Sequence, residues 1–306
     1  MVKKYIEGET KDERKLRKAK EKAEKLPKDS SQHNEDDFLR YTAGTRMDDA
    51  YGAYSHLLQQ PKPTPPLKDT DTKNYVVCLK HGVKYSSEYV NTLYNMVKRH
   101  TTVPYEFVCY TDDLRGIKAE IATERLTENG MHGWWYKPMF FDKNLTQQGN
   151  VLFFDLDVVI HNSIDKLFLF NPDSFSVCRD FNRSIRPDWK HFNSSVFKLR
   201  TGSLDYVYTE FMKNTASNMR RFQGDQDWLY AQVKEKKSPF QYWPDKWIRS
   251  YKWEMRDRKD LQRISGYRNF NKKASPEIVQ DSCVAVFHGE PHPHQCEDDW
   301  VKENWQ

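Results

Sequence analysis

The sequence predicts an α/β fold in which a mostly parallel sheet is covered by helices on both faces. Buried strand-like runs alternate with stretches of helical spacing, which is typical of a doubly wound sheet. The clearest run is Val151 to Phe154, four apolar residues that lead directly into Asp155-Leu156-Asp157. An unbroken apolar run of this kind is typical of a strand buried on both faces. Its two carboxylates stand where the strand should end, and ligands of open α/β sheets bind at that edge.

Strands and helices follow one another from residue 74 onward. Residues 75–79 are predicted to form the first buried strand. Residues 86–99 are predicted to be a helix because Tyr89, Leu93 and Val97 recur at helical spacing. The remaining strands are predicted at 105–110, 151–157, 174–178, 194–199 and 284–287, and the remaining helices at 134–143, 203–214 and 225–234.

The N-terminal part differs in charge from the rest of the chain. Residues 1–28 hold 11 Lys and Arg against 6 Asp and Glu, whereas the other 278 residues carry 38 of each sign. The body therefore lacks the basic excess typical of nucleic-acid binding. Residues 10–26 are strong helix formers with only a thin apolar stripe, and four prolines at 61–66 indicate a stiff linker. We predict a charged extension, helical or disordered, with a linker at 1–73, and one globular domain at 74–306.

The composition indicates a cytoplasmic protein. Mean hydropathy is −0.93, and no apolar run approaches the roughly 20 residues that cross a bilayer. The first residues lack the apolar core of a signal peptide. The five cysteines are an odd number without a CxxC pair, so we expect buried free thiols and no disulfide framework. These features predict no transmembrane segment and no nucleic-acid partner.

Asp155 and Asp157 have two interpretations when they are considered alone. Side chains at i and i+2 of a strand point to the same side, so the two carboxylates would repel unless a cation or donor groups held them. A divalent metal could join such carboxylates to a substrate diphosphate. Alternatively, they form an acidic strand-to-loop turn, which Asp favours. The chain has neither GxGxxG after its first strand nor GxxxxGK[ST], which argues against dinucleotide and P-loop sites.

Three further motifs follow this one along the chain. The ordered set is Phe154-Asp155-Leu156-Asp157, Phe192-Asn193-Ser194-Ser195-Val196-Phe197, Gly224-Asp225-Gln226-Asp227-Trp228-Leu229 and Phe287-His288-Gly289-Glu290-Pro291-His292-Pro293. With these motifs the chain resembles nucleotide-sugar-dependent glycosyltransferases of the GT-A fold. It most resembles the retaining branch with glycogenin and the bacterial lipopolysaccharide galactosyltransferases, over residues 75–295. The resemblance implies transfer of a hexose from a nucleotide diphosphate sugar, UDP-linked, to a hydroxyl acceptor on a glycan, a lipid-linked sugar or a protein.

The resemblance also implies a metal cofactor. Asp155, Asp157 and His288 match the ligands of a Mn²⁺ or Mg²⁺ ion, and Mn²⁺ tolerates an imidazole beside carboxylates. A bound cation would stabilise the diphosphate leaving group as a Lewis acid. Taken alone, His288 could equally be a histidine that is satisfied at the end of a strand.

The remaining site residues are implied in the same way. Asp225 and Gln226 match a pair beside the anomeric carbon and are the expected catalytic residues, with Asp225 as an electrostatic and donor-positioning group rather than a nucleophile. The surrounding motif is also typical of a helix start, so Asp225 could be an N-cap. Tyr85 is expected to stack on the nucleotide base. The donor is expected to contact Leu79, Lys80, Tyr85, Lys137, Asp155, Leu156, Asp157, Asn193, Ser194, Gly289 and His292.

One residue departs from the pattern. In glycogenin-like enzymes the late motif ends with a lysine that contacts the diphosphate, and His292 stands at that place here. An imidazole has a pKa near 6.5, so its charge at pH 7 is partial. Two alternative functions stay open. One is an inverting GT-A transferase with Asp227 or Glu254 as the base. The other is an inactive module that binds a sugar nucleotide.

Overall fold

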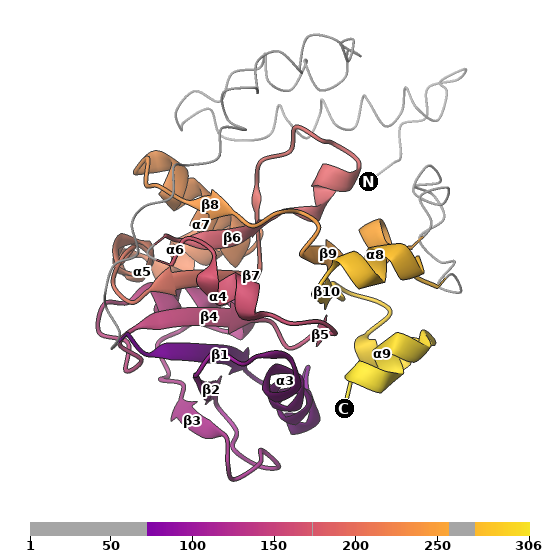
Figure 1. Ribbon diagram of the computed structural model, residues 1–306. Helices are drawn as coiled ribbons and strands as arrows, with labels where there is room; N and C mark the ends of the chain where they lie inside the picture. Colours follow the sequence, from indigo (N-terminus) through magenta and orange to yellow (C-terminus); the bar gives the residue numbers. More distant parts are fainter. Residues whose placement is uncertain (1–71, 173, 257–272) are drawn as a thin grey trace, which may run out of the picture. The chain divides into compact units, whose positions relative to one another are not determined.

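The structure is a computed structural model that describes residues 72–172, 174–256 and 273–306. Strands and helices alternate in these ranges, and Figure 1 shows a central sheet with helices packed against it. The predicted α/β class is confirmed. The predicted extension and linker lie outside the described residues except for Thr72 and Lys73, and remain a prediction. In the described part, no helix combines the length and apolarity needed to cross a lipid bilayer.

Seven strands form the main sheet, in the order β3-β2-β1-β4-β7-β6-β8. β1 runs parallel to β2 and β4, and the outer pairs β2–β3 and β6–β8 are also parallel, whereas β7 is antiparallel to β4 and β6. The mostly parallel sheet is therefore confirmed. The bounds are β1 Asn74–Lys80, β2 Glu106–Thr111, β3 Ala122–Arg125, β4 Asn150–Phe154, β6 Ser176–Arg179, β7 Phe192–Arg200 and β8 Gln241–Tyr242.

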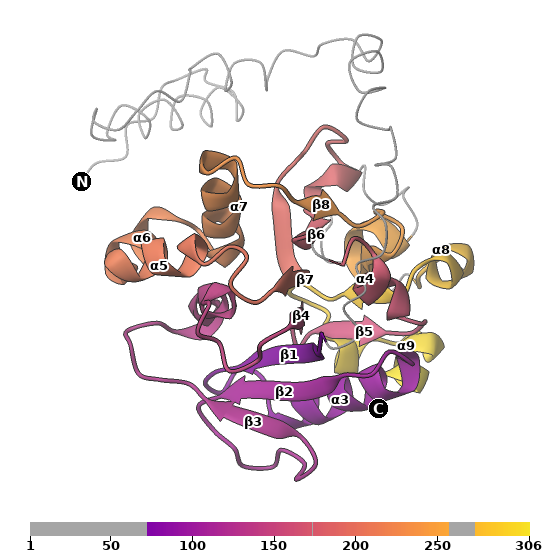
Figure 2. The same cartoon turned by 60° about the vertical axis from the view of Figure 1, so that its left-hand side comes forward.

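Helices lie on both sides of this sheet (Figure 2). The predicted helices at 86–99 and 225–234 are confirmed, and the one at 203–214 is shorter. The segment predicted as a helix at 134–143 is a 3₁₀ helix with Pro138 in its interior. The bounds are α3 Ser87–His100, η3 Gly133–Phe141, α4 Asp165–Leu169, η4 Phe181–Ser184, α5 Tyr206–Lys213, α6 Thr215–Arg221, α7 Asp225–Glu235, π-helix η5 Tyr251–Met255, α8 Pro276–Asp281, η8 Pro293–Gln295 and α9 Asp299–Asn304.

Alternate residues of the central strands enter two hydrophobic cores, one on each face of the sheet. Leu152 and Phe154 of β4 belong to the core that includes residues of α3. Val151 and Phe153 belong to the core formed with η3, α5 and α7. All four side chains are fully buried. The interpretation of this run as a strand buried on both faces is therefore confirmed.

The strand predicted at 151–157 ends at Phe154, and Asp155-Leu156-Asp157 forms a turn into a second sheet. This sheet has the order β5-β10-β9, from β5 Val158–Ile160, β9 Ile248–Ser250 and β10 Val284–Val286. β10 is antiparallel to β5, with Val286 opposite Val158. The pairing continues one step further, since the Phe287 N–H donates to the Asp157 carbonyl at 2.9 Å. The second sheet thus brings the late motif beside the acidic turn.

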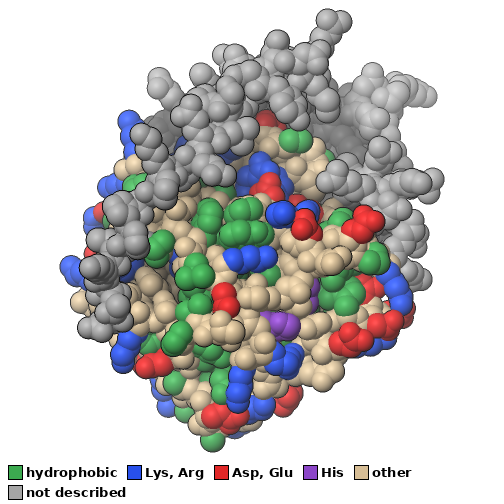
Figure 3. All heavy atoms as spheres, in the orientation of Figure 1, with side chains coloured by type: hydrophobic (Ala, Val, Ile, Leu, Met, Phe, Trp, Pro, Cys, Tyr) green, Lys and Arg blue, Asp and Glu red, His purple; other side chains and the backbone are tan. Residues whose placement is uncertain are grey.

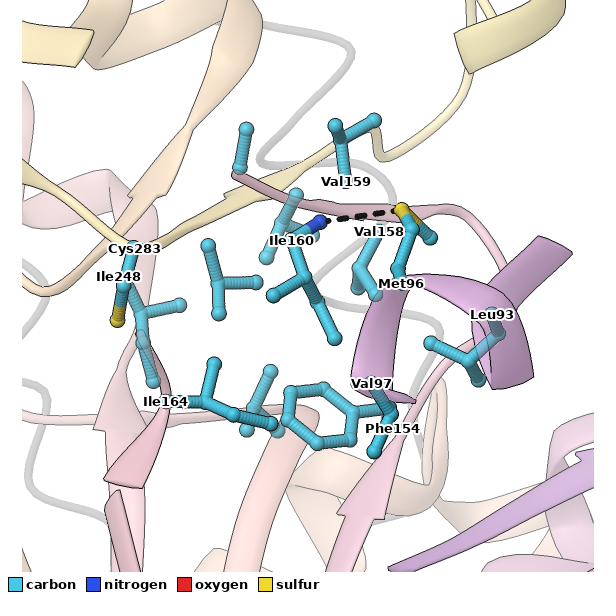
Figure 4. Packing of buried hydrophobic residues seen from close by; sticks show 14 of the residues in the cluster. Leu93, Met96, Val97, Phe154, Val158, Val159, Ile160, Ile164, Ile248 and Cys283 are labelled. Atoms are coloured by element: carbon cyan, nitrogen blue, oxygen red, sulfur yellow. Dashed lines mark hydrogen bonds between the residues drawn. The ribbon is translucent and has the colours of Figure 1, made fainter. Parts of the chain in front are cut away.

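The packing around the acidic turn holds it in place. Figure 4 shows α3 lying against β5 and the end of β4, with Met96 close to Ile160 and Val97 close to Phe154. The Ile160 N–H donates to the sulfur of Met96 at 3.3 Å. These side chains are completely buried. Because buried cores are close-packed, the residues on either side of the turn have little freedom to move.

A buried ion pair anchors the segment that follows β9. Arg183 Nε donates to Glu254 Oε1 at 2.9 Å, and its Nη2 donates to Oε2 at 3.0 Å. The same Nη2 donates to the Ile248 carbonyl at 2.8 Å. Glu254 Oε2 also accepts the Ser250 N–H at 2.9 Å. Both charged side chains are buried, so this pair ties η4 to β9 and η5.

Removing one partner of this pair should be costly. Arg183→Met would leave the Glu254 carboxylate buried and uncompensated, so we expect the free energy of unfolding to fall by about 3–5 kcal/mol in urea denaturation. Arg115→Met is a matched control, because Arg115 pairs with Asp113 at the surface and such pairs contribute about 1 kcal/mol or less. Equal losses in the two variants would contradict an anchoring role for Arg183.

Candidate active site

The buried ammonium group of Lys137 joins three motifs that are far apart in the sequence. Its Nζ lies 2.8 Å from Asp155 Oδ1 and 3.5 Å from Asp225 Oδ2. It also lies 3.3 Å from the carbonyl oxygen and from the hydroxyl oxygen of Ser194. η3 supplies Lys137, the end of β4 supplies Asp155, β7 supplies Ser194 and the first turn of α7 supplies Asp225. These four predicted site residues therefore meet at one edge of the sheet.

The charges in this group stabilise one another. Burial alone would lower the pKa of Lys137, but Asp155 and Asp225 outweigh that effect and the pKa lies above its usual value. Burial raises the pKa of Asp225, and Lys137 and the Ser194 hydroxyl limit the rise. Lys137 thus stays protonated and holds two carboxylates that would otherwise repel. The N-cap of α7 is Gly224, so the alternative of Asp225 as the N-cap is wrong.

Asp157 occupies a different environment from Asp155. Its side chain is buried, and the Tyr85 hydroxyl donates to Oδ2 at 2.7 Å. Burial, together with the charge of Asp155, raises the pKa of Asp157 to about 6. Burial and the charge of Asp157 raise the pKa of Tyr85, so its hydroxyl remains a donor. The ionised form of Asp157 is therefore less favourable than that of an exposed aspartate, and a cation beside it would stabilise it.

The three predicted metal ligands are brought close by the backbone, but their side chains do not converge on one point. His288 follows Phe287, whose N–H donates to the Asp157 carbonyl. His288 Nε2 lies 2.6 Å from the Ser250 hydroxyl oxygen, and its ring stacks on Phe181 at a centroid distance of 5.5 Å. Within the described ranges, no three His, Cys, Asp or Glu side chains are grouped as metal ligands. Asp155 is held by Lys137 instead.

The chemistry of these side chains nevertheless fits a divalent cation. Asp157 is a buried carboxylate whose charged form a cation would stabilise. Burial, with the charge of Lys252, lowers the pKa of His288 to about 3, so its imidazole is neutral, which is the form that binds metals. The Ser250 contact occupies Nε2 and leaves Nδ1 for a ligand, and metal-binding histidines commonly use their second nitrogen in this way.

The late motif contributes Gly289 and His292. Gly289 has a φ of +78°, in the left-handed region that favours glycine. The His292 ring meets Tyr85 edge-on at 6.1 Å and lies parallel to His294 at 5.8 Å. Burial, then His294 and Lys84, lower the pKa of His292. His292 is therefore mostly neutral at pH 7 and does not reproduce the charge of a lysine.

The other residues expected near the nucleotide differ in burial and in the contacts that they make. The Leu156 side chain is buried in the core, so only its backbone can face a ligand. Lys80 is also buried and lies 3.4 Å from the Gly82 carbonyl through Nζ. Leu79 packs at the margin of the second core. The Tyr85 ring packs on Tyr89, with a centroid distance of 4.8 Å, and its stacking on a base stays a prediction.

The remaining predicted residues have partners that the motifs did not indicate. Asn193 Oδ1 accepts the Ser195 N–H at 3.1 Å. Gln226 Nε2 lies 3.5 Å from Asp180 Oδ2. Asp180 and Ser250, the partner of His288, were not expected as site residues. Neither residue belongs to a motif or a periodic pattern, so only the sheet topology reveals their position.

Replacing Asp157 by asparagine should stabilise the metal-free protein above pH 6. The native carboxylate has a folded pKa of about 6 against 3.8 unfolded, so its ionisation opposes folding at pH values above 6. Asn keeps an acceptor for Tyr85 and removes that cost, which is at most about 3 kcal/mol. The gain should shrink as the pH falls from 6 towards 3.8, because Asp157 becomes protonated first in the folded state and below that pH in both states. Urea denaturation of both proteins with a chelator across pH 4–8 measures the difference, and a gain that does not change with pH would contradict this cause.

Comparisons with known proteins agree with this architecture. Neither a protein-family model nor a curated protein matches the sequence. The glycosyltransferase GlyE of Streptococcus pneumoniae TIGR4 aligns at a TM-score of 0.52 and 13% identity, over 76% of this chain and 60% of that chain. A mutant of LgtC aligns at 0.49 and 12% identity, over 75% of this chain and 93% of that chain. A complex of the galactosyltransferase LgtC with donor and acceptor sugar analogues gives 0.45. The chain thus has the GT-A fold of a solved glycosyltransferase.

Proposed function

We propose that this protein is a hexosyltransferase that moves a sugar from a UDP-linked donor to a hydroxyl acceptor, with retention at the anomeric carbon. The observation that carries the proposal is the cluster of Lys137, Asp155, Ser194 and Asp225, in a chain with the GT-A fold. The cluster lies where β4 ends and α7 begins, and ligands of open α/β sheets bind at that edge.

Asp155, Asp157 and His288 would hold Mn²⁺ or Mg²⁺ in this proposal. Carboxylate oxygen suits both ions, and an imidazole nitrogen favours Mn²⁺. When bound, the cation supplies Lewis-acid stabilisation of the negative charge on the leaving diphosphate. Loading of the site would also stabilise the ionised form of Asp157, whose pKa is about 6.

Asp225 would orient the donor sugar. Its buried carboxylate is fixed by Lys137 and Ser194, so it can accept a sugar hydroxyl and face the positive charge that develops at the anomeric carbon. Lys137 acts as a positioning residue, because its ammonium group already contacts Asp155, Asp225 and Ser194. Gln226 follows Asp225 in the same helical turn and would contribute a neutral amide.

Retention would follow from attack on the face that the diphosphate leaves. The acceptor hydroxyl then passes its proton to the leaving phosphate, and no separate base is needed. An inverting enzyme needs a free carboxylate base. Glu254, one candidate for that role, is occupied by Arg183 and the Ser250 N–H. Asp227 is the other candidate, and burial raises its pKa, so it is the residue to test against retention.

The acceptor is a hydroxyl of a glycan, a lipid-linked sugar or a protein.

The proposal is tested by donor hydrolysis and product analysis. Purified protein with Mn²⁺ should release UDP from UDP-glucose or UDP-galactose, and a chelator should reduce the rate by at least about 100-fold. The anomer of the product, read by NMR, distinguishes retention from inversion. A panel of UDP, GDP, ADP and CDP sugars without any release would contradict the proposed activity.

Asp225→Asn should slow turnover strongly while UDP binding is kept. The substitution preserves shape and removes the charge that faces the anomeric carbon, so we expect kcat to fall by about 100-fold or more. The affinity for UDP, measured by calorimetry, should change less than about threefold because Asp225 faces the sugar. Asp299→Asn, at an exposed position in the first turn of α9, is the matched control. An unchanged kcat in Asp225→Asn would contradict the assignment, and a loss confined to Asp227→Asn would favour inversion.

A further inference from the structure

Lys252 places an ammonium group beside the late motif from a separate element. Its Nζ lies 3.4 Å from the Glu290 carbonyl oxygen. A Cβ at position 289 would lie 3.1 Å from the same nitrogen. Gly289 therefore both permits the left-handed backbone and leaves room for the lysine head group.

The charge of Lys252 affects the pKa values of two histidines in the late motif. Burial lowers the pKa values of His288 and His292, and Lys252 adds to both shifts. Burial lowers the pKa of Lys252, and the charges of Glu290 and Asp157 partly offset that shift. Among the described residues, no carboxylate forms an ion pair with this half-buried ammonium group, and its hydrogen-bond partner is a neutral carbonyl. An anion that entered here would therefore gain a charged partner without displacing an ion pair.

A buried network fixes Lys252 and His288 relative to each other. Lys252 is the second residue of η5, and π-helical turns are rare and frequent at functional sites. The Ser250 hydroxyl accepts the Trp253 N–H at 3.1 Å, which caps η5, and it also contacts His288. Glu254, held by Arg183, accepts the Ser250 N–H. The hydrogen bonds of Ser250 thus hold both His288, a candidate metal ligand, and the turn that carries Lys252, a candidate anion ligand.

A second lysine approaches from the turn after β1. The Nζ of Lys84 lies 4.8 Å from the centre of the Tyr85 ring. Burial and Asp155 raise the pKa of Asp157, and Lys84 partly offsets that rise. The charge of Lys84 also helps to lower the pKa of His292, as the charge of Lys252 does. In Figure 3, Lys and Arg side chains surround acidic and histidine side chains near the middle of the molecule's visible face.

We propose that Lys252, assisted by Lys84, binds the diphosphate of the nucleotide in place of the lysine whose position His292 occupies. This inference rests on the proposed function and names the protein groups that hold the leaving group. An ammonium group is a compact charge with three donors that suits phosphate oxygens. Lys252 contacts the late motif at Glu290, and Lys84 lies over the ring of Tyr85, whose hydroxyl donates to Asp157. A diphosphate beside the late motif would therefore meet both ammonium groups close to the proposed cation site.

The test compares binding of UDP and uridine to the metal-loaded protein at fixed salt. Lys252→Met keeps most of the side-chain length and removes the charge. We expect it to weaken UDP binding by about 10- to 100-fold in calorimetry, with uridine binding unchanged in ligand-observed NMR. Lys252→Arg should stay within about threefold of the native affinity. Lys213→Met is the matched control, because Lys213 is an exposed lysine of α5 that pairs with Glu210, and it should bind UDP normally.

A rescue variant separates a phosphate contact from a structural role. Lys252→Met combined with His292→Lys moves the charge to the motif position, and UDP affinity should recover by at least about tenfold. A structural defect at residue 252 would not be repaired in this way. Native UDP affinity in Lys252→Met, or no recovery in the double variant, would overturn the inference alone. Failure of the native protein to bind UDP, GDP, ADP or CDP would instead overturn the proposed function.

Discussion

The contact of the Lys137 ammonium group with Asp155 and Asp225 is the interaction on which the candidate site depends. The middle of η3, the end of β4 and the start of α7 meet there, and each brings a charge that could not remain buried alone. Because Lys137 is buried and bonded on several sides, it fixes the distance between the acidic turn after β4 and the start of α7. The two halves of the proposed donor site, one for the diphosphate and one for the sugar, are thereby held in one geometry.

A second constraint joins the late part of the chain to this frame. The pairing of β10 with β5 sets His288 beside Asp157, since the Phe287 N–H continues the ladder by one bond. The Arg183–Glu254 pair then holds the π-helical turn that carries Lys252. The groups that we propose to bind the metal and the diphosphate thus depend on a three-stranded sheet and one buried ion pair, not on the main sheet alone.

The sequence predicted five of the seven strands of the main sheet, but not its short outer strands β3 and β8 or the contacts that join the late part of the chain to it. The run from Val151 to Phe154 has apolar side chains on both faces, so its place at the centre of the sheet follows from composition. The strand ends at Phe154, directly before the two carboxylates that mark its predicted end. Of the second sheet only the strand at 284–287, which is β10, was predicted, because three-residue strands such as β5 carry almost no periodic signal. The contacts of Ser250 and Lys252 depend on that sheet, so they could not be inferred from spacing.

The distribution of charge in the candidate site is uneven. Asp155 is neutralised by Lys137, whereas Asp157 has a raised pKa and mainly a tyrosine hydroxyl as its partner. The site therefore has an unmet requirement for positive charge at Asp157, which a divalent ion could fill. Beside the late motif, the half-buried ammonium group of Lys252 forms no ion pair with a carboxylate of the described residues. In the proposed function, a ligand with two linked phosphates would satisfy both requirements, because it would share the cation proposed at Asp157 and bond to the Lys252 ammonium group. In the proposed site a neutral His292 would need to provide only shape and a polar edge, because the charge would come from Lys252, forty positions earlier in the chain.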